Sequence, residues 1–488
     1  MEATSNNEAY ERARLSRDAR FDGQFFVGVR TTGIYCRPVC PANSPKSENI
    51  SFFATAAAAG EAGYRPCLRC RPECAPGTPA WHGTSTTVRR GLKLIASGAL
   101  DDGNIEELSE RLGVTSRHLR RLFTTHLGAS PLAVAHTQRL HFAKRLIDQT
   151  NMPMQDIAVA AGYGSVRRFN DAFRNTYGRP PRELRRKDRE WQRDASRPAF
   201  GVRLSYRKPF DWQSQLDFFS ARAIPGVERV TSGAYRRTVR VGMETGVIEV
   251  AHDPRSESLT LTLHGIETVN LFPVVQVVRD MFDVDAPIGD ISASLGIDEF
   301  LRAHLKSHPG IRVPGTWDGY ELTVRAILGQ QVSVKAATTI SGRIAERYGE
   351  PYRFGDLTRL FPTPQKLMRA RFNDIGLVSA RAETIRRVSR AVVDETIDFD
   401  ASQDPQEFCA ALTSIKGIGE WTAQYVAMRV LKNPDAFPAS DLGLLKAFDS
   451  ECGKRIRPAE LEQRSAAWRP WRAYAATLLW SSLGGSGG

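Results

Sequence analysis

The sequence lacks any long apolar run and contains little cysteine, and both shortages narrow what the chain can be. A membrane-spanning helix needs about twenty consecutive apolar residues, and no such stretch occurs in the sequence. The opening residues, MEATSNNEAYERARLSRDARF, lack the apolar core of a secretory signal. We therefore expect a cytoplasmic protein, associated with the bacterial nucleoid and without a membrane partner. In that reducing compartment, clustered cysteines more often bind metal or do chemistry than form disulfides.

The length and the charge indicate several domains and a polyanionic partner. A chain of 488 residues corresponds to about three domains. Its hydrophobic content of 41% is enough for packed cores rather than disorder. The formal net charge of +13 favours nucleic acid as the partner. A merely solvated basic surface is the alternative that charge alone leaves open.

Five of the seven cysteines fall between residues 36 and 74. Cys36 and Cys40 form a C-x3-C pair, Cys67 and Cys70 form a C-x2-C pair, and 26 residues separate the two pairs. Two such pairs suit a tetrahedral Zn²⁺ site with four thiolate ligands. Cys74, in LRCRPEC, is a surplus thiol that could replace Cys70, although the tighter C-x2-C spacing favours Cys70.

The stretches FVGVRTTGIYCRPVCPA and GYRPCLRCRPE resemble the N-terminal domain of Ada-type DNA alkylation-response proteins. The resemblance implies that Cys36 is both a zinc ligand and the irreversible acceptor of a methyl group from a DNA methylphosphotriester. It also implies phosphate contacts by Thr32 and Arg65, although residues 41–44 (PANS) stand where the family has basic residues. A zinc-stabilised DNA-binding module without methyl transfer stays open, because only the resemblance argues against it.

The electrostatics of such a centre fit this role. Zinc keeps thiols deprotonated at neutral pH, and four thiolates on one Zn²⁺ leave a net negative centre. It would repel ordinary phosphates but admit a neutral methylphosphotriester. Methylation of Cys36 would remove one negative charge, and the affinity for DNA should rise because phosphate electrostatics dominates it.

Between the cysteines and the middle of the chain, the pattern is helical and occurs twice. In residues 105–128, apolar residues recur every three or four positions, Gly113 interrupts them, and Thr115 and Ser116 offer an N-cap. Residues 154–181 repeat this plan, with Gly162 and Gly164 in the turn and Ser165 as cap.

Residues 84 to about 187 resemble the DNA-binding domain of AraC-type activators, which carries two helix-turn-helix units. The resemblance implies that each second helix enters a major groove of double-stranded DNA and that RNA polymerase is a further partner. A plain helical protein-interaction domain is the alternative. The candidate DNA-contacting residues are Arg117, His118, Arg120, Arg121, Arg167, Arg168 and Asn170.

The C-terminal half begins with strand patterns and ends helical. TVRVG, GVIEVAHD and SLTLTLHG predict strands after residue 200, and helices follow from about residue 311. The PCHR motif of a second Ada methyltransferase domain is absent. Residues 201–483 instead resemble AlkA-type DNA-3-methyladenine glycosylases, with LTSIKGIGEWTAQYVAMRV as their helix-hairpin-helix.

This second resemblance implies DNA contacts around the hairpin. Lys416, Gly417 and Gly419 would bring backbone amides to a phosphate, because glycine permits close approach. Gln331, in GQQVSV, stands where the best-known relative inserts an apolar wedge beside the flipped nucleotide. A monovalent cation would be held by hairpin carbonyls, namely those of Thr413, Ile415 and Ile418.

The family's catalytic aspartate corresponds to Asp441 in FPASDLGLLK. Its carboxylate would stabilise the oxocarbenium-like sugar and direct water to it. Trp421, Tyr425 and Trp480 would hold the flipped cationic base by stacking and cation–π attraction. The alternatives are that Asp441 only caps the following helix and that the aromatic residues only pack the core.

We therefore predict a monomeric, multidomain protein, mainly α with α+β parts. Its function would be an adaptive response to DNA alkylation: methyl transfer to Cys36, transcription activation and excision of N-alkylated purines. A transcription regulator whose glycosylase half binds DNA without catalysis is the alternative. The Pro/Gly-rich residues 73–85 and the charged residues 185–198 read as linkers. The expected domains are a zinc domain (1–75), a double helix-turn-helix domain (84–190), an α+β subdomain (200–310) and a helix-hairpin-helix domain (311–483).

Overall fold

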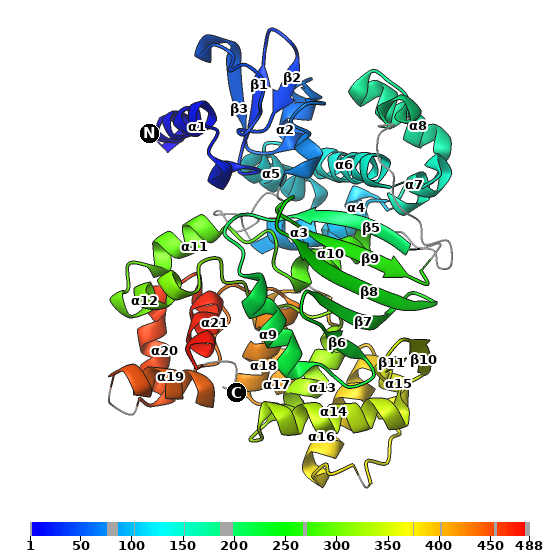
Figure 1. The fold of residues 1–488 in the computed structure, drawn as a ribbon, viewed down its shortest axis with the longest axis vertical. Helices are drawn as coiled ribbons and strands as arrows, with labels where there is room; N and C mark the ends of the chain where they lie inside the picture. The colour runs from blue at the N-terminus through cyan, green and yellow to red at the C-terminus, as the bar shows by residue number, and fades with distance from the viewer. Residues whose placement is uncertain are drawn as a thin grey trace.

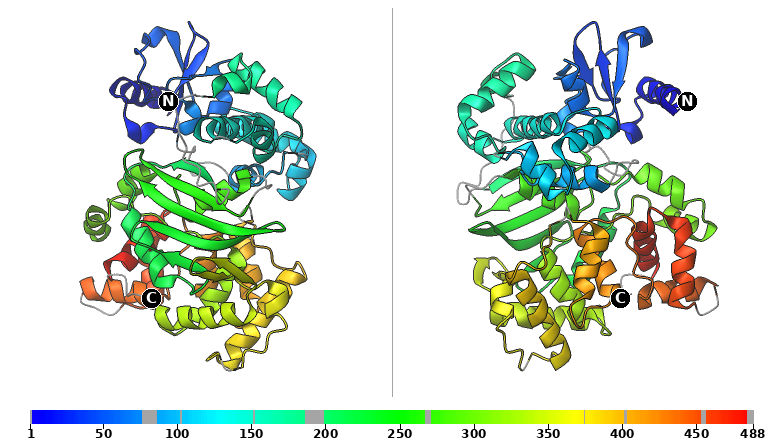
Figure 2. Two further views of the ribbon diagram at one scale, coloured as in Figure 1. Left: turned by 45° about the vertical axis from the view of Figure 1, so that its right-hand side comes forward. Right: turned by 180° about the vertical axis from the view of Figure 1, so that it is seen from behind.

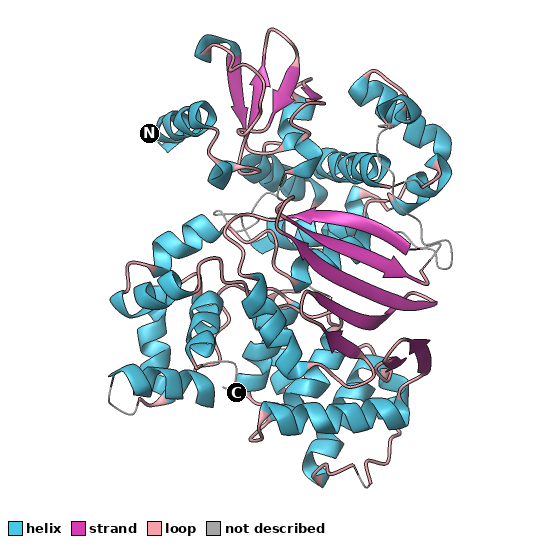
Figure 3. Cartoon of the chain, viewed as in Figure 1, coloured by secondary structure: helices cyan, strands magenta, loops and turns pink. Residues whose placement is uncertain are grey.

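The structure, a computed structural model, is mainly helical with one large sheet (Figures 1 and 3). The predicted fold class is confirmed. Among the described helices, none is long and apolar enough to cross a membrane. Most of both predicted linkers lies outside the described residues. The structure describes residues 2–75, 86–101, 103–150, 152–185, 199–266, 271–373, 375–400, 403–452 and 456–483.

The N-terminal region is a small sheet with two helices and little core. Its four strands lie in the order β3-β1-β2-β4. The buried apolar residues fall into two small groups around Phe25 and Phe26. So small a core is marginal without a staple, which agrees with the predicted metal. The elements are α1 (Glu2–Ser16), β1 (Phe26–Val29), β2 (Ile34–Cys36), β3 (Ile50–Phe53), α2 (Ala56–Glu61) and β4 (Arg65–Pro66).

Two helix-turn-helix units follow, as the sequence predicts. Gly113 and Gly162 turn the chain with positive φ angles of 69° and 74°. The hydroxyl groups of Thr115 and Ser165 cap the second helix of each unit. The long, largely buried helix α6 between the units was not predicted. The helices are α3 (Thr86–Ala96), α4 (Ile105–Arg111), α5 (Ser116–Leu127), α6 (Pro131–Gln149), α7 (Met154–Ala160) and α8 (Val166–Tyr177).

A five-stranded antiparallel sheet opens the C-terminal half, in the order β5-β9-β8-β7-β6. Strands β7, β8 and β9 confirm the three predicted strands, while β5 and β6 at the two edges were not predicted. The elements are β5 (Ala199–Ser205), α9 (Trp212–Arg222), β6 (Glu228–Val230), β7 (Ala234–Val241), β8 (Glu244–Asp253), β9 (Ser258–His264) and α10 (Leu271–Met281).

The remainder is a helical domain built on one apolar core. It holds the helix-hairpin-helix, formed by α17, the turn at residues 414–419, and α18. The elements are α11 (Ile288–Leu295), α12 (Glu299–Ser307), α13 (Gly319–Gly329), α14 (Val334–Tyr348), β10 (Pro351–Phe354), β11 (Leu357–Arg359), α15 (Pro364–Leu367), α16 (Ser379–Val393), α17 (Pro405–Thr413), α18 (Glu420–Val430), α19 (Leu442–Cys452), α20 (Pro458–Ser465) and α21 (Arg472–Ser482).

The two halves of the chain share a core, which the sequence did not suggest. Buried residues of α6, α7 and α8 belong to the same apolar cluster as those of the sheet and α10. The rings of Phe142 and Phe272 lie 5.2 Å apart, and the amide of Arg203 in β5 donates to Gln149 Oε1 at 2.9 Å. Figure 2 shows the helix-turn-helix region resting on the sheet. The halves are therefore packed together rather than merely tethered.

Candidate functional site

The structure brings Cys36, Cys40, Cys67 and Cys70 together, with all four sulfurs within 4.8 Å of one another. Tetrahedral zinc with bonds of about 2.3 Å to sulfur places the sulfurs about 3.8 Å apart, so the set fits Zn²⁺. Cys74 lies outside this set, and burial raises the pKa of its thiol. The described part of the chain thus favours Cys70 over Cys74 as the fourth ligand.

The sheet explains how two distant cysteine pairs meet. Strands β2 and β4 are parallel neighbours, and the Cys67 amide donates to the Tyr35 carbonyl at 3.0 Å. The Arg37 amide donates to Cys70 Sγ at 3.3 Å. Binding of a metal ion by these thiols requires that they be deprotonated.

Thr32 and Arg65, the predicted phosphate contacts, are both exposed on this small domain. Thr32 lies in the turn between β1 and β2, and Arg65 lies on β4 beside Ile34. Arg65 also faces the helix-turn-helix domain, because its Nη1 would lie 3.6 Å from a Cβ added at Gly178. The two side chains therefore flank the strand that ends in Cys36.

Buried polar contacts dock the cysteine domain on helix α6. The Tyr35 hydroxyl, one residue before Cys36, lies 2.9 Å from His141 Nε2. Arg71, one residue after Cys70, pairs with Asp148 at 2.5 Å. Lys144 pairs with the same carboxylate at 2.5 Å and with Glu73 at 3.6 Å. Burial lowers the pKa of His141 to about 3, so its imidazole is neutral at pH 7.

The predicted DNA contacts of the activator domain lie in the N-terminal halves of α5 and α8. His118 and Asn170 are half-buried, whereas the arginines are exposed: Arg117, Arg120, Arg121, Arg167 and Arg168. Arg120 reaches Glu106 at 3.7 Å, and Arg121 lies 3.1 Å from His118 Nδ1. Exposed cationic side chains in the N-terminal part of a helix suit entry into a major groove.

Asp441 is buried and precedes helix α19. Its Oδ1 accepts from the Leu444 amide at 3.0 Å, so the capping role considered from the sequence is present. Its two oxygens also accept from the indole nitrogens of Trp480 and Trp421, each at 2.9 Å. A carboxylate that only capped a helix would not need both indoles, and these contacts aim it into the adjacent cavity.

That cavity has a volume of about 100 Å³ and is lined by Trp421, Tyr425, Trp480 and Asp441. The rings of Trp421 and Tyr425 stack at 5.4 Å with an interplanar angle of 9°. Trp480 meets Tyr425 edge to face at 6.2 Å. The structure therefore brings together all four residues that the sequence predicted for this site.

The sequence analysis missed the three arginines that line the cavity, Arg222, Arg325 and Arg429. Arg429 donates to the Tyr425 hydroxyl at 2.8 Å and lies over its ring at 5.4 Å, and Arg222 also lines the cavity. Burial alone would raise the pKa of Tyr425, but the charges of these arginines outweigh it and the pKa is lowered. Helical spacing could have found Arg429, because positions 421, 425 and 429 share one face of a helix. Trp421, Trp480 and Arg429 thus already contact the Tyr425 ring.

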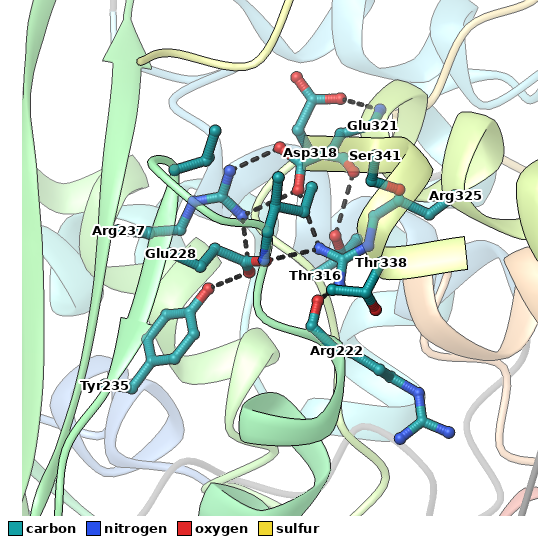
Figure 4. A network of polar contacts seen from close by, with 12 residues as sticks. Arg222, Glu228, Tyr235, Arg237, Thr316, Asp318, Glu321, Arg325, Thr338 and Ser341 are labelled. Carbon is teal, nitrogen blue, oxygen red and sulfur yellow. Dashed lines mark hydrogen bonds and ion pairs between the residues drawn. The ribbon is translucent and has the colours of Figure 1, made fainter. Parts of the chain in front are cut away.

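A buried network of charges fixes the wall of this cavity (Figure 4). Arg237 of β7 pairs with Glu321 of α13 at 2.5 Å. Arg325, which lines the cavity, pairs with Glu321 at 3.1 Å and with Glu228 at 2.9 Å. Arg325 also donates to the Arg222 carbonyl. The network joins the sheet to α13, so the subdomain that carries Arg222 has a fixed position against the helical domain.

Thr384 and Gln330 pack against the hairpin of the helix-hairpin-helix at Gly417. Gly417 has a φ of 105°, and an added Cβ would lie 2.0 Å from Thr384 Oγ1, so this position requires glycine. Gly419 has open space and an ordinary φ of −101° as N-cap of α18. Gln330 donates to the Gly417 carbonyl at 3.2 Å.

Two predicted DNA contacts beside the hairpin are exposed. Lys416 belongs to the hairpin itself, and Gln331 follows α13 with a φ of 57°. Val332, the next residue, and Val334, the first residue of α14, line the cavity beside Asp441. Gln331 therefore stands at the rim of that cavity, where a wedge residue is expected.

Four protein families match successive parts of the chain. Residues 9–73 match the metal binding domain of Ada, and residues 108–187 match a helix-turn-helix domain. Residues 201–318 match the AlkA N-terminal domain, and residues 324–473 match the HhH-GPD superfamily of base excision DNA repair proteins. The first two matches cover the cysteine cluster and the helix-turn-helix units, and the last match covers Asp441.

Similar proteins combine these parts or contain one of them. The "Probable bifunctional transcriptional activator/DNA repair enzyme AlkA" of Mycobacterium tuberculosis is 41% identical over 476 residues, which cover 97% of this chain and 95% of that protein. The DNA-3-methyladenine glycosylase 2 of Escherichia coli is 32% identical over 58% of this chain and 97% of its own length. The solved 3-methyladenine DNA-glycosylase of Archaeoglobus fulgidus covers 58% of this chain and 97% of its own, with 22% identity and a TM-score of 0.51, and so shares the fold. The chain therefore belongs to the family of bifunctional transcriptional activators and DNA repair enzymes that join an Ada metal-binding domain and a helix-turn-helix domain to an AlkA-type glycosylase.

Proposed function

We propose that this chain detects DNA methylphosphotriesters through Cys36, activates transcription through its helix-turn-helix domain and excises N-alkylated purines such as 3-methyladenine at Asp441. One observation carries the proposal: a single chain holds both a four-cysteine cluster that fits zinc and a buried carboxylate between two indole donors. A buried carboxylate held between two indole donors is not needed for a transcription regulator that only binds DNA.

In the methyl transfer, the Cys36 sulfur attacks the methyl carbon of the triester. A bond forms between sulfur and carbon, the carbon–oxygen bond breaks, and its electron pair stays on the phosphate as a diester anion. Zinc held by Cys36, Cys40, Cys67 and Cys70 would keep the sulfur deprotonated. Cys36 is half-buried rather than enclosed, so a DNA backbone can reach it, and the exposed Thr32 and Arg65 would hold the flanking phosphates.

In the excision, the flipped base enters the cavity beside Trp421 and Trp480. An N-alkylated purine carries positive charge and is a good leaving group, so it needs little acid assistance. The Asp441 carboxylate faces the sugar as positive charge develops there and helps to direct water to it. Its indole contacts fix the carboxylate before the reaction, so no reorganisation is required at that moment.

Several further assignments belong to the same proposal. Lys416, Gly417 and Gly419 would bind a DNA phosphate, and Gln331 would fill the gap that the flipped nucleotide leaves. Carbonyls of Thr413, Ile415 and Ile418 would hold a monovalent cation at the hairpin. We further propose a monomer that works at the nucleoid and contacts RNA polymerase.

The test is a pair of reciprocal variants in the full chain. Cys36→Ala should abolish methyl gain from methylphosphotriester DNA, located by peptide mass spectrometry, and should spare release of 3-methyladenine. Asp441→Asn should reduce that release by about 10²–10³-fold and should spare methyl gain and binding to alkylated duplex. Full 3-methyladenine release by Asp441→Asn, or methyl gain by Cys36→Ala, would contradict the proposed roles.

A further inference from the structure

Helix α3 of the activator domain reaches into the glycosylase. Lys93 of α3 is half-buried, and its Nζ donates to the carbonyl of Leu431, the C-cap residue of α18. Seen from behind, α3 lies above the orange helices of the helix-hairpin-helix (Figure 2, right). The contact therefore joins the activator domain to the helix that carries two of the base-pocket aromatics.

The C-terminal end of α18 sets the floor of the base pocket. Arg429, two residues before Leu431, donates to the carbonyls of Pro314 and Gly315 at 2.9 and 2.8 Å and to the Tyr425 hydroxyl. Its guanidinium also lies 4.9 Å from the centre of the Phe218 ring, another wall of the pocket. A shift at the end of α18 would thus reach the pocket through Arg429.

A second contact joins the first helix-turn-helix unit to the segment upstream of the motif's other helix. Arg111, at the end of α4, pairs with Asp400 at 3.3 Å, and α17 begins at Pro405. The hairpin at residues 414–419 joins the end of α17 to the start of α18. Lys93 therefore contacts the C-terminal end of α18, and Arg111 contacts the segment upstream of the N-terminal end of α17. Both of these helix ends are remote from the hairpin.

The chemistry of the Lys93 contact suits a brace. The last carbonyls of a helix have no partners within the helix, and a cation there is favoured by the helix dipole. Burial lowers the pKa of Lys93 to about 8, against the opposing charge of Asp280, so the ammonium is mostly charged at pH 7. Lys93 also lines a cavity of about 540 Å³ between α3, α6 and α10, and Arg429 and Val430 line the same cavity from the glycosylase side. The two halves are therefore not fully packed against each other around Lys93.

We propose that helix α3 and the first helix-turn-helix unit that follows it are a structural part of the glycosylase and that Lys93 of α3 is a positioning residue for base excision. It acts through the end of α18 on Arg429 and Tyr425 and touches no reacting atom. This inference rests on the proposed excision activity, and it means that the activator domain serves the repair reaction as well as promoter binding.

The experiment compares variants of the full chain in single-turnover release of 3-methyladenine from methylated duplex DNA. Lys93→Met removes the charge and the donors but keeps the length, and it should slow release about five-fold, because small misplacements far from the chemistry are costly. Lys93→Arg should restore the rate. Lys306→Met, which changes an exposed lysine of α12, is the matched control and should match the wild type.

Two further measurements separate positioning from general stability. In Lys93→Met the dissociation constant for undamaged duplex should stay within about two-fold, while the last-turn amides of α18 should exchange hydrogen faster. Arg111→Gln changes an exposed side chain, leaves folding safe, and should slow release by a smaller factor. The underlying excision activity is established if the wild-type chain releases 3-methyladenine and the Asp441→Asn variant does not. If that activity is present, the inference is overturned when Lys93→Met releases 3-methyladenine at the wild-type rate. It is also overturned when Lys93→Met loses rate, DNA affinity and melting temperature equally and Lys93→Arg restores none of them.

Discussion

The cysteine cluster and the Asp441 pocket each fix the position of a reactive side chain, a thiolate in one and a carboxylate in the other. They do so by different means. The cluster lies in a domain whose buried apolar residues form two small groups, so a metal must supply the rigidity. The pocket lies in a large helical core, and hydrogen bonds from Trp421 and Trp480 orient its carboxylate. The first centre depends on a removable ion and the second on packing, and perturbations should distinguish them.

Removal of zinc should give the largest difference between the two centres. We expect one zinc per chain by metal analysis. Its removal by a chelator should unfold residues 13–75 and abolish methyl gain completely, because a structural zinc site contributes folding energy outright. Release of 3-methyladenine should persist, since the described glycosylase residues form no comparable cysteine cluster. Hydrogen exchange would locate the unfolded segment, and a parallel collapse of both activities would refute the contrast.

Asp148→Asn should sharpen the comparison by loosening the cysteine domain from α6 without touching the cluster. The change leaves the half-buried Arg71 and the buried Lys144 without their shared carboxylate, and breaking a buried ion pair costs about 3–5 kcal/mol. Chemical denaturation should show an earlier transition for the N-terminal region. Glu48→Gln is the control, because it removes an exposed ion pair worth about 0–1 kcal/mol. Equal effects of both variants would show that the docking contacts are weak.

The two glycines of the hairpin should differ within the glycosylase itself. Gly417→Ala forces a side chain toward Thr384 at a positive φ, and such strain costs about 1–3 kcal/mol. Gly419→Ala has space and an ordinary φ, and its cost should be about 1 kcal/mol or less. Thermal unfolding and affinity for duplex would measure both. A Gly419 variant that loses more DNA affinity than Gly417→Ala would indicate that close phosphate approach at Gly419 matters more than backbone strain.

Methylation of Cys36 should have the smallest and most salt-dependent effect. Removing one negative charge from the cluster should tighten promoter binding several-fold at low salt, and the difference should shrink as salt screens it. Fluorescence anisotropy with methylated and unmethylated protein over a salt series would test this. Identical binding at low salt would reject the charge account even if the methyl transfer occurs.

The sequence predicted most where the chemistry is local. Spacing alone indicated the zinc ligands, and glycine and cap positions indicated both helix-turn-helix units, because these signals act within a few residues. The Asp441 pocket unites residues 421, 425, 441 and 480, and only the family resemblance connected them. The Lys93 contact was missed because a charged residue on a helix does not reveal which distant carbonyl it reaches, whereas Arg429 could have been found from its helical spacing to Trp421 and Tyr425. The common core of the halves was also missed, since apolar periodicity shows that a face is buried but not against what.

The packing of α6 on β5 has a consequence for colloidal behaviour. Strand β5 is at the edge of the large sheet, and edge strands offer unpaired backbone groups on which other chains can assemble. Its residues Gly201, Val202 and Leu204 are buried, and Val202 and Leu204 belong to the cluster that includes α6. A glycosylase fragment cut at residue 199 would bare this apolar strand. Such a fragment should aggregate when it is concentrated. The activator half therefore also keeps the repair half soluble by covering this strand.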